Sequence, residues 1–536
     1  MSTATGSSRI PDRFGRTVGR ATLVLVALGL AWRAVRYALA FPLWGDEAFL
    51  AVNFFSRDLA GLAEPLEFRQ VAPPGFLWGE WLVVRTIGGS ERALRLLPFL
   101  SGVGSLLLFW RFCRQTLTRR AGLLAVALMA ASFFPVRYAA EVKPYAFDLF
   151  VSLLVTSLAW SVWNAPESRR RWLALTAASA LGVWFSYTAV FPVAGVGLVL
   201  LFRAWRAGEY RTWALAFGLV SGTSWLAMMV GFARPQLGET PWLLTIWHEG
   251  FPPLSQPWRL PWWLVETHTG GLVAYPYGGR TLTGLPTALL AGAGAFALWR
   301  SPRRRWLALL LLSPLPLAVL AAALRRYPYG TSTRLMLYMA PAVCMLAGQG
   351  MAVVLQKFGT LRRGPVAVAG LLALIPVVCT VCDVCMPYRK RDDLEYRRFV
   401  ANLASKTAPG DRWVVFDGAD PLPHYPAVMA SVWVQRVAKL RYYVLSLSPV
   451  PARFESDPRS LASSSLSDGR TWLILHDHGF AALYPQAVRA RFEPTARAAL
   501  GPPASSRHTL PVGSTVDVHV FDPGLASRPA EDRAVR

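Results

Sequence analysis

Long apolar segments separated by short clusters of arginine are the feature that most constrains this chain. The sequence has 536 residues, of which 54% are hydrophobic and only 16% are charged, whereas about 25% of residues are charged in a typical soluble domain. A helix needs about 20 apolar residues to cross the hydrocarbon core of a bilayer. We therefore predict a polytopic α-helical membrane protein with about eleven spans. The expected spans are Ala21–Leu43, Ala93–Phe112, Ala121–Val136, Tyr145–Trp163, Trp172–Tyr187, Val190–Trp205, Trp213–Phe232, Leu282–Leu298, Trp306–Leu324, Leu335–Leu355 and Val366–Cys385.

The arginine clusters fall in every second connection between these spans, which sets the orientation. Lys and Arg are concentrated in the cytoplasmic connections of membrane proteins, so we expect a multi-pass protein of the cytoplasmic (inner) membrane with a cytoplasmic N-terminus. An odd number of spans then places the C-terminal part outside the cytoplasm. The formal net charge of +25 follows this pattern and suits anionic membrane lipids, so no nucleic acid is expected as a partner. The cytoplasmic arginines include Arg111, Arg114, Arg119, Arg120, Arg169, Arg170, Arg171, Arg203, Arg206, Arg211, Arg300, Arg303, Arg304, Arg305, Arg362 and Arg363.

The same reading divides the chain into four parts. The composition changes after the last expected span, where mixed charge replaces apolar runs and the pieces "RWVVFDG", "TWLILHD" and "TVDVHVFD" are typical of strands. We therefore expect an extracytoplasmic α/β domain large enough for its own core. The predicted parts are a cytoplasmic tail at 1–20, a transmembrane domain at 21–385 with outer loops at 44–92, 137–144, 233–281 and 325–334, the soluble domain at 386–523, and a flexible tail at 524–536.

Ionisable side chains gather in the outer loops, close to the ends of the spans. Asp46 and Glu47 follow the first span in "FPLWGDEAFLAV", Glu141 and Lys143 precede the fourth, and Arg334 precedes the tenth. Ionisable groups near membrane depth are costly and therefore mark functional sites. Together they offer carboxylates for acid–base chemistry and cations for a phosphate group.

Each of these residues also has a purely structural interpretation. Acidic residues suit a helix N-terminus, which would account for Asp46. Glu141 and Lys143 could form a local ion pair, and Arg334 could extend toward the membrane surface. Metal binding by the cysteines of "CTVCDVC" or the histidines of "LHDH" is disfavoured because neither provides a full ligand set. No metal site or cofactor is assigned, and a divalent metal stays an open alternative.

Four motifs taken together resemble the GT-C glycosyltransferases. They are "WGDEAF", "APPGFLWGEW", "YAAEVKPYAFD" and "TSTRLMLYMAP". The branch they resemble is family 39, which includes protein O-mannosyltransferases and lipid A aminoarabinose transferases, and the resemblance covers roughly Ala21 to Cys385.

The resemblance implies a GT-C-like fold and a set of site residues. The catalytic carboxylate maps onto Asp46, with Glu47 beside it, and the acid of the second outer loop maps onto Glu141. The predicted catalytic residues are therefore Asp46, Glu47 and Glu141. Ala72 stands where the family often has lysine or histidine, so binding of the lipid phosphate is expected to fall to other cations. The substrate-binding residues are then Arg69, Lys143, Tyr145, Arg334 and Tyr338.

The expected function is that of a membrane glycosyltransferase working on the outer face. The resemblance implies a polyprenyl-phosphate-linked sugar as donor, an acceptor that is a protein, lipid or glycan, and a single inverting displacement. Two other classes stay open. A transporter or lipid flippase would carry mid-span charges and broken helices in two related halves, whereas a non-catalytic scaffold for envelope assembly would tolerate loss of Asp46.

Overall fold

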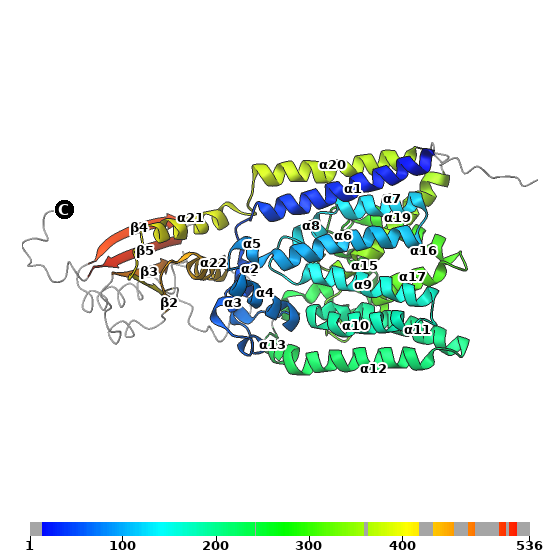
Figure 1. Ribbon diagram of the computed structural model, residues 1–536, viewed down its shortest axis with the longest axis horizontal. Helices are drawn as coiled ribbons and strands as arrows, with labels where there is room; N and C mark the ends of the chain where they lie inside the picture. Colours follow the sequence, from blue (N-terminus) through cyan, green and yellow to red (C-terminus); the bar gives the residue numbers. More distant parts are fainter. Residues whose placement is uncertain are drawn as a thin grey trace, which may run out of the picture.

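The protein is elongated, with a bundle of long helices at one end and a small β-sheet at the other (Figure 1). The computed structural model describes residues 13–238, 240–241, 243–357, 363–416, 432–454, 470–477, 503–510 and 514–522. The start of the predicted tail at 1–20 and the whole of the predicted tail at 524–536 lie outside these residues.

The bundle is built from the apolar segments that the sequence marks as spans. Each expected span coincides with a helix, and proline divides the ninth into two consecutive helices. The helices of the bundle are α1 (Arg13–Ala38), α6 (Leu96–Thr116), α7 (Arg119–Ala131), α9 (Tyr145–Asn164), α10 (Arg169–Phe185), α11 (Val190–Ala207), α12 (Arg211–Met228), α16 (Leu285–Trp299), α17 (Arg305–Leu312), α18 (Pro314–Ala323), α19 (Ala340–Lys357) and α20 (Gly364–Cys385).

Eight helical segments in the described part of the chain are long and apolar enough to cross a membrane. The prediction of a multi-pass membrane protein is therefore confirmed. The three remaining expected spans correspond to α7, α10 and α16, which have 13, 17 and 15 residues. These helices are shorter than the roughly 20 residues that a bilayer requires, so the total of eleven spans stays a prediction.

Helix α19 lies at the centre of the bundle, and every residue from Ala340 to Gly350 is buried. Its close approach to α16 depends on glycine, because a Cβ atom added at Gly294 would meet the Leu346 carbonyl oxygen at 1.9 Å. A Cβ atom at Gly350 would meet the Leu290 carbonyl oxygen at the same distance. Small residues let membrane helices approach closely and gain dispersion energy that lipid cannot supply.

The first and last long helices pack side by side along one face of the bundle (Figure 1). Near the ends that face the C-terminal region, Arg36 on α1 forms an ion pair with Asp383 on α20 at 2.5 Å. Trp32 on α1 donates a hydrogen bond from Nε1 to the same carboxylate at 3.0 Å. The described bundle is thus closed by a polar contact between segments 347 residues apart in the chain.

Short helices form the outer surface between the bundle and the C-terminal region. Most of them occupy loops that the sequence predicts to lie on the outer side, whereas α8, η4 and η8 fall at the ends of expected spans, and proline and glycine keep them short. The α-helices are α2 (Gly45–Ala51), α3 (Asn53–Ser56), α4 (Pro74–Thr86), α5 (Glu91–Leu94), α8 (Phe133–Tyr138), α13 (Arg234–Gly238), α14 (Leu243–Ile246) and α15 (Leu260–Thr269). The 3₁₀ and π turns are η1 (Gly61–Ala63), η2 (Glu67–Arg69), η3 (Tyr187–Ala189), η4 (Met229–Ala233), η5 (His248–Gly250), η6 (Pro257–Arg259), η7 (Gly271–Val273) and η8 (Leu337–Met339).

The described residues of the C-terminal region form a five-stranded mixed sheet and two helices. The strand order is β2-β1-β3-β5-β4, in which β1 runs parallel to β2 and β3, while β5 runs antiparallel to β3 and β4. The strands predicted from "RWVVFDG", "TWLILHD" and "TVDVHVFD" are confirmed as β1, β3 and β5. The bounds are α21 (Arg391–Ser405), β1 (Arg412–Phe416), α22 (Val432–Leu447), β2 (Ala452–Phe454), β3 (Thr471–Asp477), β4 (Ala504–Leu510) and β5 (Ser514–Phe521).

This region shares an apolar core with the outer loops. Helix α22 packs against α2, and Tyr443 accepts a hydrogen bond at its hydroxyl from the backbone N–H of Leu43 at 3.0 Å. Arg441 pairs with Glu67 at 3.1 Å. The sequence predicts a domain with its own core, whereas the structure joins the two parts. Members of the shared core include Leu43, Phe49, Phe54, Leu62, Phe76 and Val142 from the outer loops, and Tyr396, Trp413, Val415, Leu440, Tyr442, Tyr443 and Trp472 from the C-terminal region.

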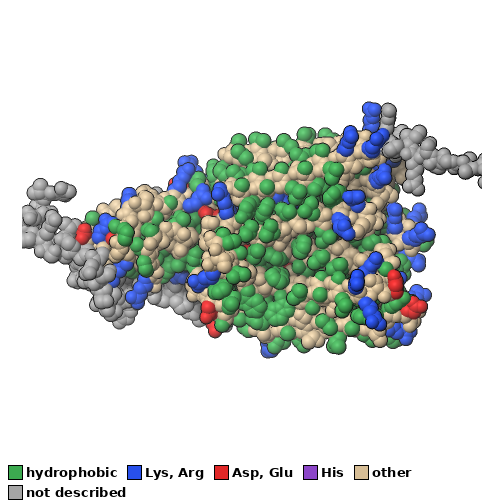
Figure 2. Space-filling view, viewed as in Figure 1, with side chains coloured by type: hydrophobic (Ala, Val, Ile, Leu, Met, Phe, Trp, Pro, Cys, Tyr) green, Lys and Arg blue, Asp and Glu red, His purple; other side chains and the backbone are tan. Residues whose placement is uncertain are grey.

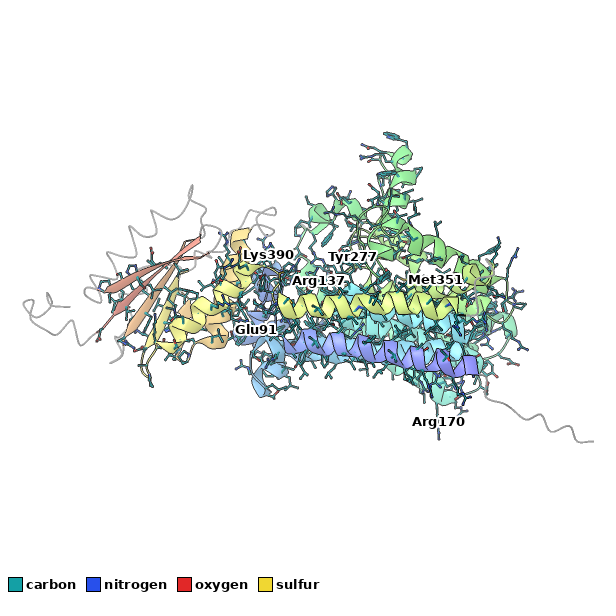
Figure 3. The ribbon with its side chains drawn as sticks, turned by 90° about the horizontal axis from the view of Figure 1, so that it is seen from above. Glu91, Arg137, Arg170, Tyr277, Met351 and Lys390 are labelled. Atoms are coloured by element: carbon teal, nitrogen blue, oxygen red, sulfur yellow. The ribbon has the colours of Figure 1, made fainter. Side chains whose placement is uncertain are left out.

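The two ends of the bundle differ in charge. The space-filling view shows Lys and Arg gathered at the end remote from the sheet, with an apolar middle (Figure 2). Arg170 lies at that remote end, whereas Glu91, Arg137 and Lys390 lie where the bundle meets the C-terminal region (Figure 3). The arginine clusters thus gather at one end, as the positive-inside pattern predicts.

Candidate active site

The site begins where the chain leaves α1 and starts α2. Trp44 has extended backbone angles at the N-cap position, and the next residues turn into the helix. Asp46 and Glu47 occupy its first turn, where acidic side chains complement the helix dipole. The Glu47 carboxylate also accepts a hydrogen bond from the Trp44 backbone N–H at 3.4 Å. The helix-terminus interpretation therefore applies to Glu47, and Asp46 is left to other partners.

Glu47 forms a buried ion pair with Arg95. The guanidinium donates from Nε to Oε1 at 3.0 Å and from Nη2 to Oε2 at 2.8 Å. The backbone N–H of Val142 donates to Oε1 at 2.8 Å. The two side chains are 1% and 2% exposed. This closed ion pair joins three segments, and its geometry leaves little room for a substrate to reach Glu47.

Asp46 forms a second and more open ion cluster. Its carboxylate lies 3.3 Å from Lys143 Nζ through Oδ1 and 2.9 Å from Arg334 Nη1 through Oδ2. The side chain of Asp46 is 23% exposed and that of Arg334 is 25% exposed. Lys143 also donates to Gln70 Oε1 at 2.9 Å. The Arg334 guanidinium lies 4.9 Å from the centre of the Trp247 ring. Three outer loops, far apart in sequence, thus meet at one carboxylate.

The charges in this open cluster determine how Asp46 ionises. Burial by itself raises the pKa of Asp46, but Lys143 and Arg334 lower it more, so the net pKa lies below its ordinary value. Burial lowers the pKa of Lys143 below its usual range, although Asp46 acts in the opposite direction. Asp46 is therefore an ionised carboxylate at neutral pH.

Glu141 lies beside this cluster and pairs with a different cation. Arg137 donates from Nε to Glu141 Oε1 at 2.6 Å, one helical turn earlier in the chain. The other oxygen, Oε2, is buried and has no hydrogen-bond partner within the described residues. The suggested local pair between Glu141 and Lys143 is therefore wrong, because each binds another residue. The unpartnered oxygen leaves Glu141 able to accept one more hydrogen bond.

The other predicted substrate-binding residues differ in position. Arg69 ends η2 with φ 47°, a left-handed conformation that is uncommon outside glycine. Its side chain is half-buried and makes no hydrogen bond or ion pair with the described residues, although its neighbour Gln70 contacts Lys143. Tyr145 begins α9, and its ring centre lies 5.1 Å from that of Tyr138. Burial acts to lower the pKa of Arg334, but Tyr145 and Asp46 raise it more, so Tyr145 lies close to the open cluster.

Tyr338 lies inside the bundle. Its side chain is 1% exposed, stacks on Phe191 at 5.5 Å, and donates to Met336 Sδ at 3.7 Å. It makes no hydrogen bond with the Asp46 cluster in the part of the chain that is described. Its contact with substrate stays a prediction.

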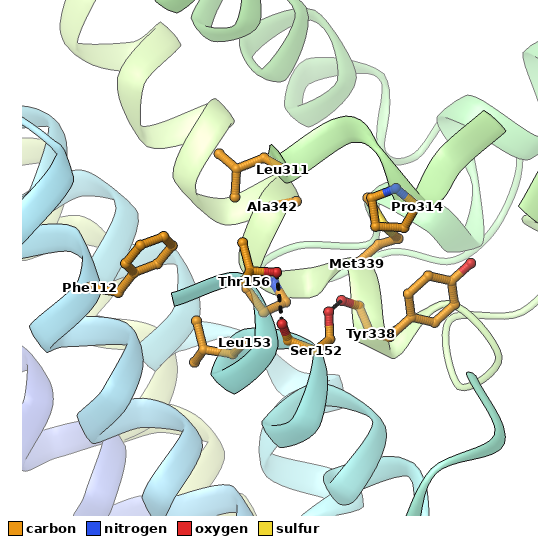
Figure 4. Close-up of a pocket in the computed structure, with 10 residues that line it drawn as sticks. Phe112, Ser152, Leu153, Thr156, Leu311, Pro314, Tyr338, Met339 and Ala342 are labelled. Atoms are coloured by element: carbon orange, nitrogen blue, oxygen red, sulfur yellow. Dashed lines mark hydrogen bonds between the residues drawn. The ribbon is translucent and has the colours of Figure 1, made fainter. Parts of the chain in front are cut away.

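Tyr338 lines a cavity of about 10 Å³, which is room for one water molecule (Figure 4). Across this cavity Ser152 Oγ donates to the Tyr338 carbonyl at 2.7 Å, and Thr156 Oγ1 donates to the Ser152 carbonyl at 2.8 Å. A cavity of this size cannot hold a sugar. A substrate would have to approach at the more open cluster around Asp46.

The described residues bring no group of three or more His, Cys, Asp or Glu side chains close enough together to hold a metal ion. Among the cysteines of α20, Cys382 and Cys385 are exposed, and Cys379 is half-buried.

Three site residues were not identified from the sequence. Arg95 neutralises Glu47, Arg137 pairs with Glu141, and Arg389 stacks on the Trp44 ring at 3.7 Å. A signal existed for Arg137, which stands just before the "YAAEVKPYAFD" motif. Arg389 follows the last span and lies in a segment assigned to the soluble domain.

Comparisons with known proteins agree with this architecture. Residues 71–231 match the family model of dolichyl-phosphate-mannose-protein mannosyltransferases. That segment contains Glu141 and Lys143, whereas Asp46 and Arg334 lie outside it. No curated protein matches the sequence.

Two crystal structures of ArnT from Cupriavidus metallidurans resemble the whole chain. The form bound to undecaprenyl phosphate has a TM-score of 0.54 at 15% identity, covering 95% of this chain and 99% of that chain. The apo form has a TM-score of 0.51 at the same identity and coverage. The archaeal oligosaccharyltransferase AglB from Archaeoglobus fulgidus, in complex with an inhibitory peptide and a dolichol-phosphate, has a TM-score of 0.44 at 12% identity, covering 95% of this chain and 75% of that chain. The chain is thus a multi-pass membrane protein with an ArnT-like fold, and its residues 71–231 resemble the dolichyl-phosphate-mannose-protein mannosyltransferases.

Proposed function

We propose that this protein transfers a sugar from a polyprenyl-phosphate donor to an acceptor on the outer face of the cytoplasmic membrane. The observation that carries the proposal is the position of Asp46, held between Lys143 and Arg334 where three outer loops meet. The family match at residues 71–231 supports a lipid-phosphate donor, as does the likeness in fold to an ArnT bound to undecaprenyl phosphate.

In the proposed reaction the acceptor hydroxyl attacks the anomeric carbon from the face opposite the phosphate. The new carbon–oxygen bond forms as the bond to the phosphate oxygen breaks, which inverts the anomeric centre. Asp46 takes the hydroxyl proton, and polyprenyl phosphate leaves with the bonding electron pair. Lys143 and Arg334 stabilise the negative charge on the leaving phosphate.

Donor binding also makes Asp46 a better base. In the free protein the two cations hold the pKa of Asp46 below its ordinary value despite its burial. A phosphate group competes for the same cations, and partial neutralisation of their charge raises the pKa of the carboxylate. A base with a higher pKa takes a proton more readily. The open ion cluster therefore couples donor binding to activation of the acceptor.

Glu141 has a supporting role in this scheme. Its buried Oε2 atom has no hydrogen-bond partner within the described residues. We assign this oxygen to a hydroxyl of the bound sugar, which supplies the missing donor. Glu47, by contrast, holds the loop in place through Arg95.

The orientation proposed is a cytoplasmic N-terminus and an extracytoplasmic C-terminal region. The gathering of arginines at the end remote from the sheet supports it (Figure 2). Alkaline phosphatase fused after the last residue should be active, because this enzyme works outside the cytoplasm. An inactive phosphatase fusion together with an active cytoplasmic reporter would contradict the orientation.

The function is tested with purified protein and a panel of polyprenyl-phosphate sugars, each offered with protein, lipid and glycan acceptors. We expect sugar transfer with at least one pair, and transfer about 10²–10⁴-fold slower by Asp46→Asn. A parallel reaction with a chelator measures whether a divalent metal is needed. Transfer that proceeds normally in folded Asp46→Asn would exclude Asp46 as the base and make Glu141 the leading candidate.

A further inference from the structure

Arg389 lies in the short connection between the membrane domain and the C-terminal region. Helix α20 ends at Cys385 and α21 begins at Arg391, so the connection comprises residues 386–390. The next residue, Lys390, lies where the bundle meets the C-terminal region, as does Arg137 (Figure 3). The connection therefore lies at the same junction as the candidate site.

Trp44 holds Arg389 in place through its ring. The Arg389 guanidinium lies 3.7 Å from the centre of the Trp44 ring, and that of Arg137 lies 6.0 Å from it. Stacking on tryptophan is the strongest of the cation–aromatic contacts. Because Trp44 is the residue that starts α2, this ring stands two positions before Asp46.

The Arg389 guanidinium stacks on Trp44, but its hydrogen-bond donors have no partner among the described residues. Arg389 is exposed and makes no hydrogen bond or ion pair with any described residue. A guanidinium held by its face keeps its N–H donors free along its edge. The Trp44 indole Nε1 is buried and also has no partner among the described residues. The Arg389 guanidinium and the Trp44 indole thus present two kinds of hydrogen-bond donor that have no acceptor among the described residues.

Charge points to an anion as the missing partner. Arg137 and Arg389 approach one ring, and of the nearby carboxylates Glu141 binds Arg137 while Asp46 is held by Lys143 and Arg334. Because Arg137 is already paired with Glu141, Arg389 is the cation of this group that lacks a counterion among the described residues, and a bound anion would supply one.

We propose that Arg389, Arg137 and Trp44 form a phosphate-binding subsite at the outer edge of the candidate active site. The identity of the phosphate rests on the proposed function, since it belongs either to the lipid donor or to a water-side substrate. The geometry itself does not rest on that function. Arg389 is supplied by the connection to the C-terminal region, so docking of that region completes the subsite.

The test compares the wild-type chain with Arg389→Gln, Arg389→Lys and the matched control Arg398→Gln. Arg398 lies on the adjacent helix α21 and is 65% exposed, so its substitution removes the same charge outside the subsite. One titration uses undecaprenyl phosphate in detergent, and the other uses inorganic phosphate at constant ionic strength. Thermal stabilisation of the purified full-length protein reports binding in both.

We expect Arg389→Gln to weaken one of the two ligands by about tenfold, which is the loss typical of one charge-assisted hydrogen bond. Loss for undecaprenyl phosphate assigns the subsite to the lipid donor, and loss for inorganic phosphate alone assigns it to a water-side substrate. Arg389→Lys should recover only part of the affinity, because lysine lacks the planar fork.

Unchanged binding of both ligands by folded Arg389→Gln would overturn the subsite and leave Arg389 as a packing residue of the connection. Equal losses in Arg398→Gln would also overturn it, because general charge would then account for the effect. Neither titration needs turnover. A protein that fails to transfer any sugar but loses phosphate binding in Arg389→Gln would refute the proposed function and retain the subsite.

Discussion

Asp46 and Glu47 are neighbours in sequence, yet they belong to two ion clusters of opposite character. Glu47 and Arg95 are 1% and 2% exposed and bind each other through two hydrogen bonds. Asp46 is 23% exposed and is shared between two cations from different loops. A buried pair that is fully satisfied fixes the backbone, whereas an open one can exchange partners. One motif thus supplies both a closed ion pair that fixes the backbone and an open carboxylate that is free to change partners.

The largest effect is expected when the open cluster loses its carboxylate. Asp46→Asn keeps the size of the side chain and removes the base, so turnover should fall about 10²–10⁴-fold. The melting temperature of the purified protein should change little, because the side chain is partly exposed. A variant that melts early and is inactive would instead show that Asp46 belongs to the frame. Transfer rates and thermal melts on the same preparation make the distinction.

The closed pair should respond in the opposite way. Glu47→Gln leaves the Arg95 charge buried without its counterion, which typically costs about 3–5 kcal/mol of stability. We expect a lower melting temperature and less monodisperse protein in detergent, with residual activity in the folded fraction. The double variant Glu47→Leu with Arg95→Met serves as the control, because an apolar pair of similar volume should restore the melt. An unchanged melting temperature for Glu47→Gln would show that the Glu47–Arg95 pair does not stabilise the fold, contrary to the comparison between the two clusters.

The third prediction distinguishes a specific effect of Lys143 and Arg334 on the donor from a general effect of surface charge. Lys143→Ala and Arg334→Ala should each weaken use of the donor by about tenfold and use of the acceptor less. Arg280→Ala, an exposed arginine of an outer loop, is the control. Steady-state kinetics with each substrate varied in turn provide the measurement. Equal losses for donor and acceptor in both variants would separate these cations from the donor phosphate.

The smallest expected effect is a shift in pH dependence. The cations lower the pKa of Asp46 in spite of its burial, so stabilisation from this pairing is present above the ordinary pKa of aspartate. It is lost as the pH falls through the lowered value. Arg334→Gln removes one cation, so the pKa of Asp46 should rise and the acidic limb of kcat/KM should move to higher pH. An acidic limb at the same pH in wild type and Arg334→Gln would show that the group titrating there is not Asp46.

Local pattern predicted the helices well because each one depends mainly on its own residues. The apolar runs and the strand-like pieces such as "RWVVFDG" both became the expected elements, since periodicity and length mark them directly. The shared core could not be predicted in this way. Tyr443 and Leu43 are 400 residues apart, and nothing in either segment indicates that the other is its partner.

The site could be predicted only in part, because the sequence marks unusual residues but not the contacts between distant segments. Asp46, Lys143 and Arg334 each stand out as ionisable groups near the membrane surface, and the structure brings them together. Arg95 lies next to an expected span among many arginines, and only its contact with Glu47 distinguishes it. Arg389 becomes recognisable only when the connection after α20 is seen crossing Trp44. Sequence marks which residues are unusual, and the fold decides which of them meet.

The ion pair between α1 and α20 has a consequence for biosynthesis. Synthesis proceeds from the N-terminus, so Arg36 is in place long before Asp383, which follows 347 residues later. Until then a cation near membrane depth lacks its counterion, which is unfavourable. Helix α20 therefore supplies the counterion that Arg36 of α1 requires. A chain interrupted before α20 leaves this arginine unpaired and exposes Trp32, which is otherwise buried.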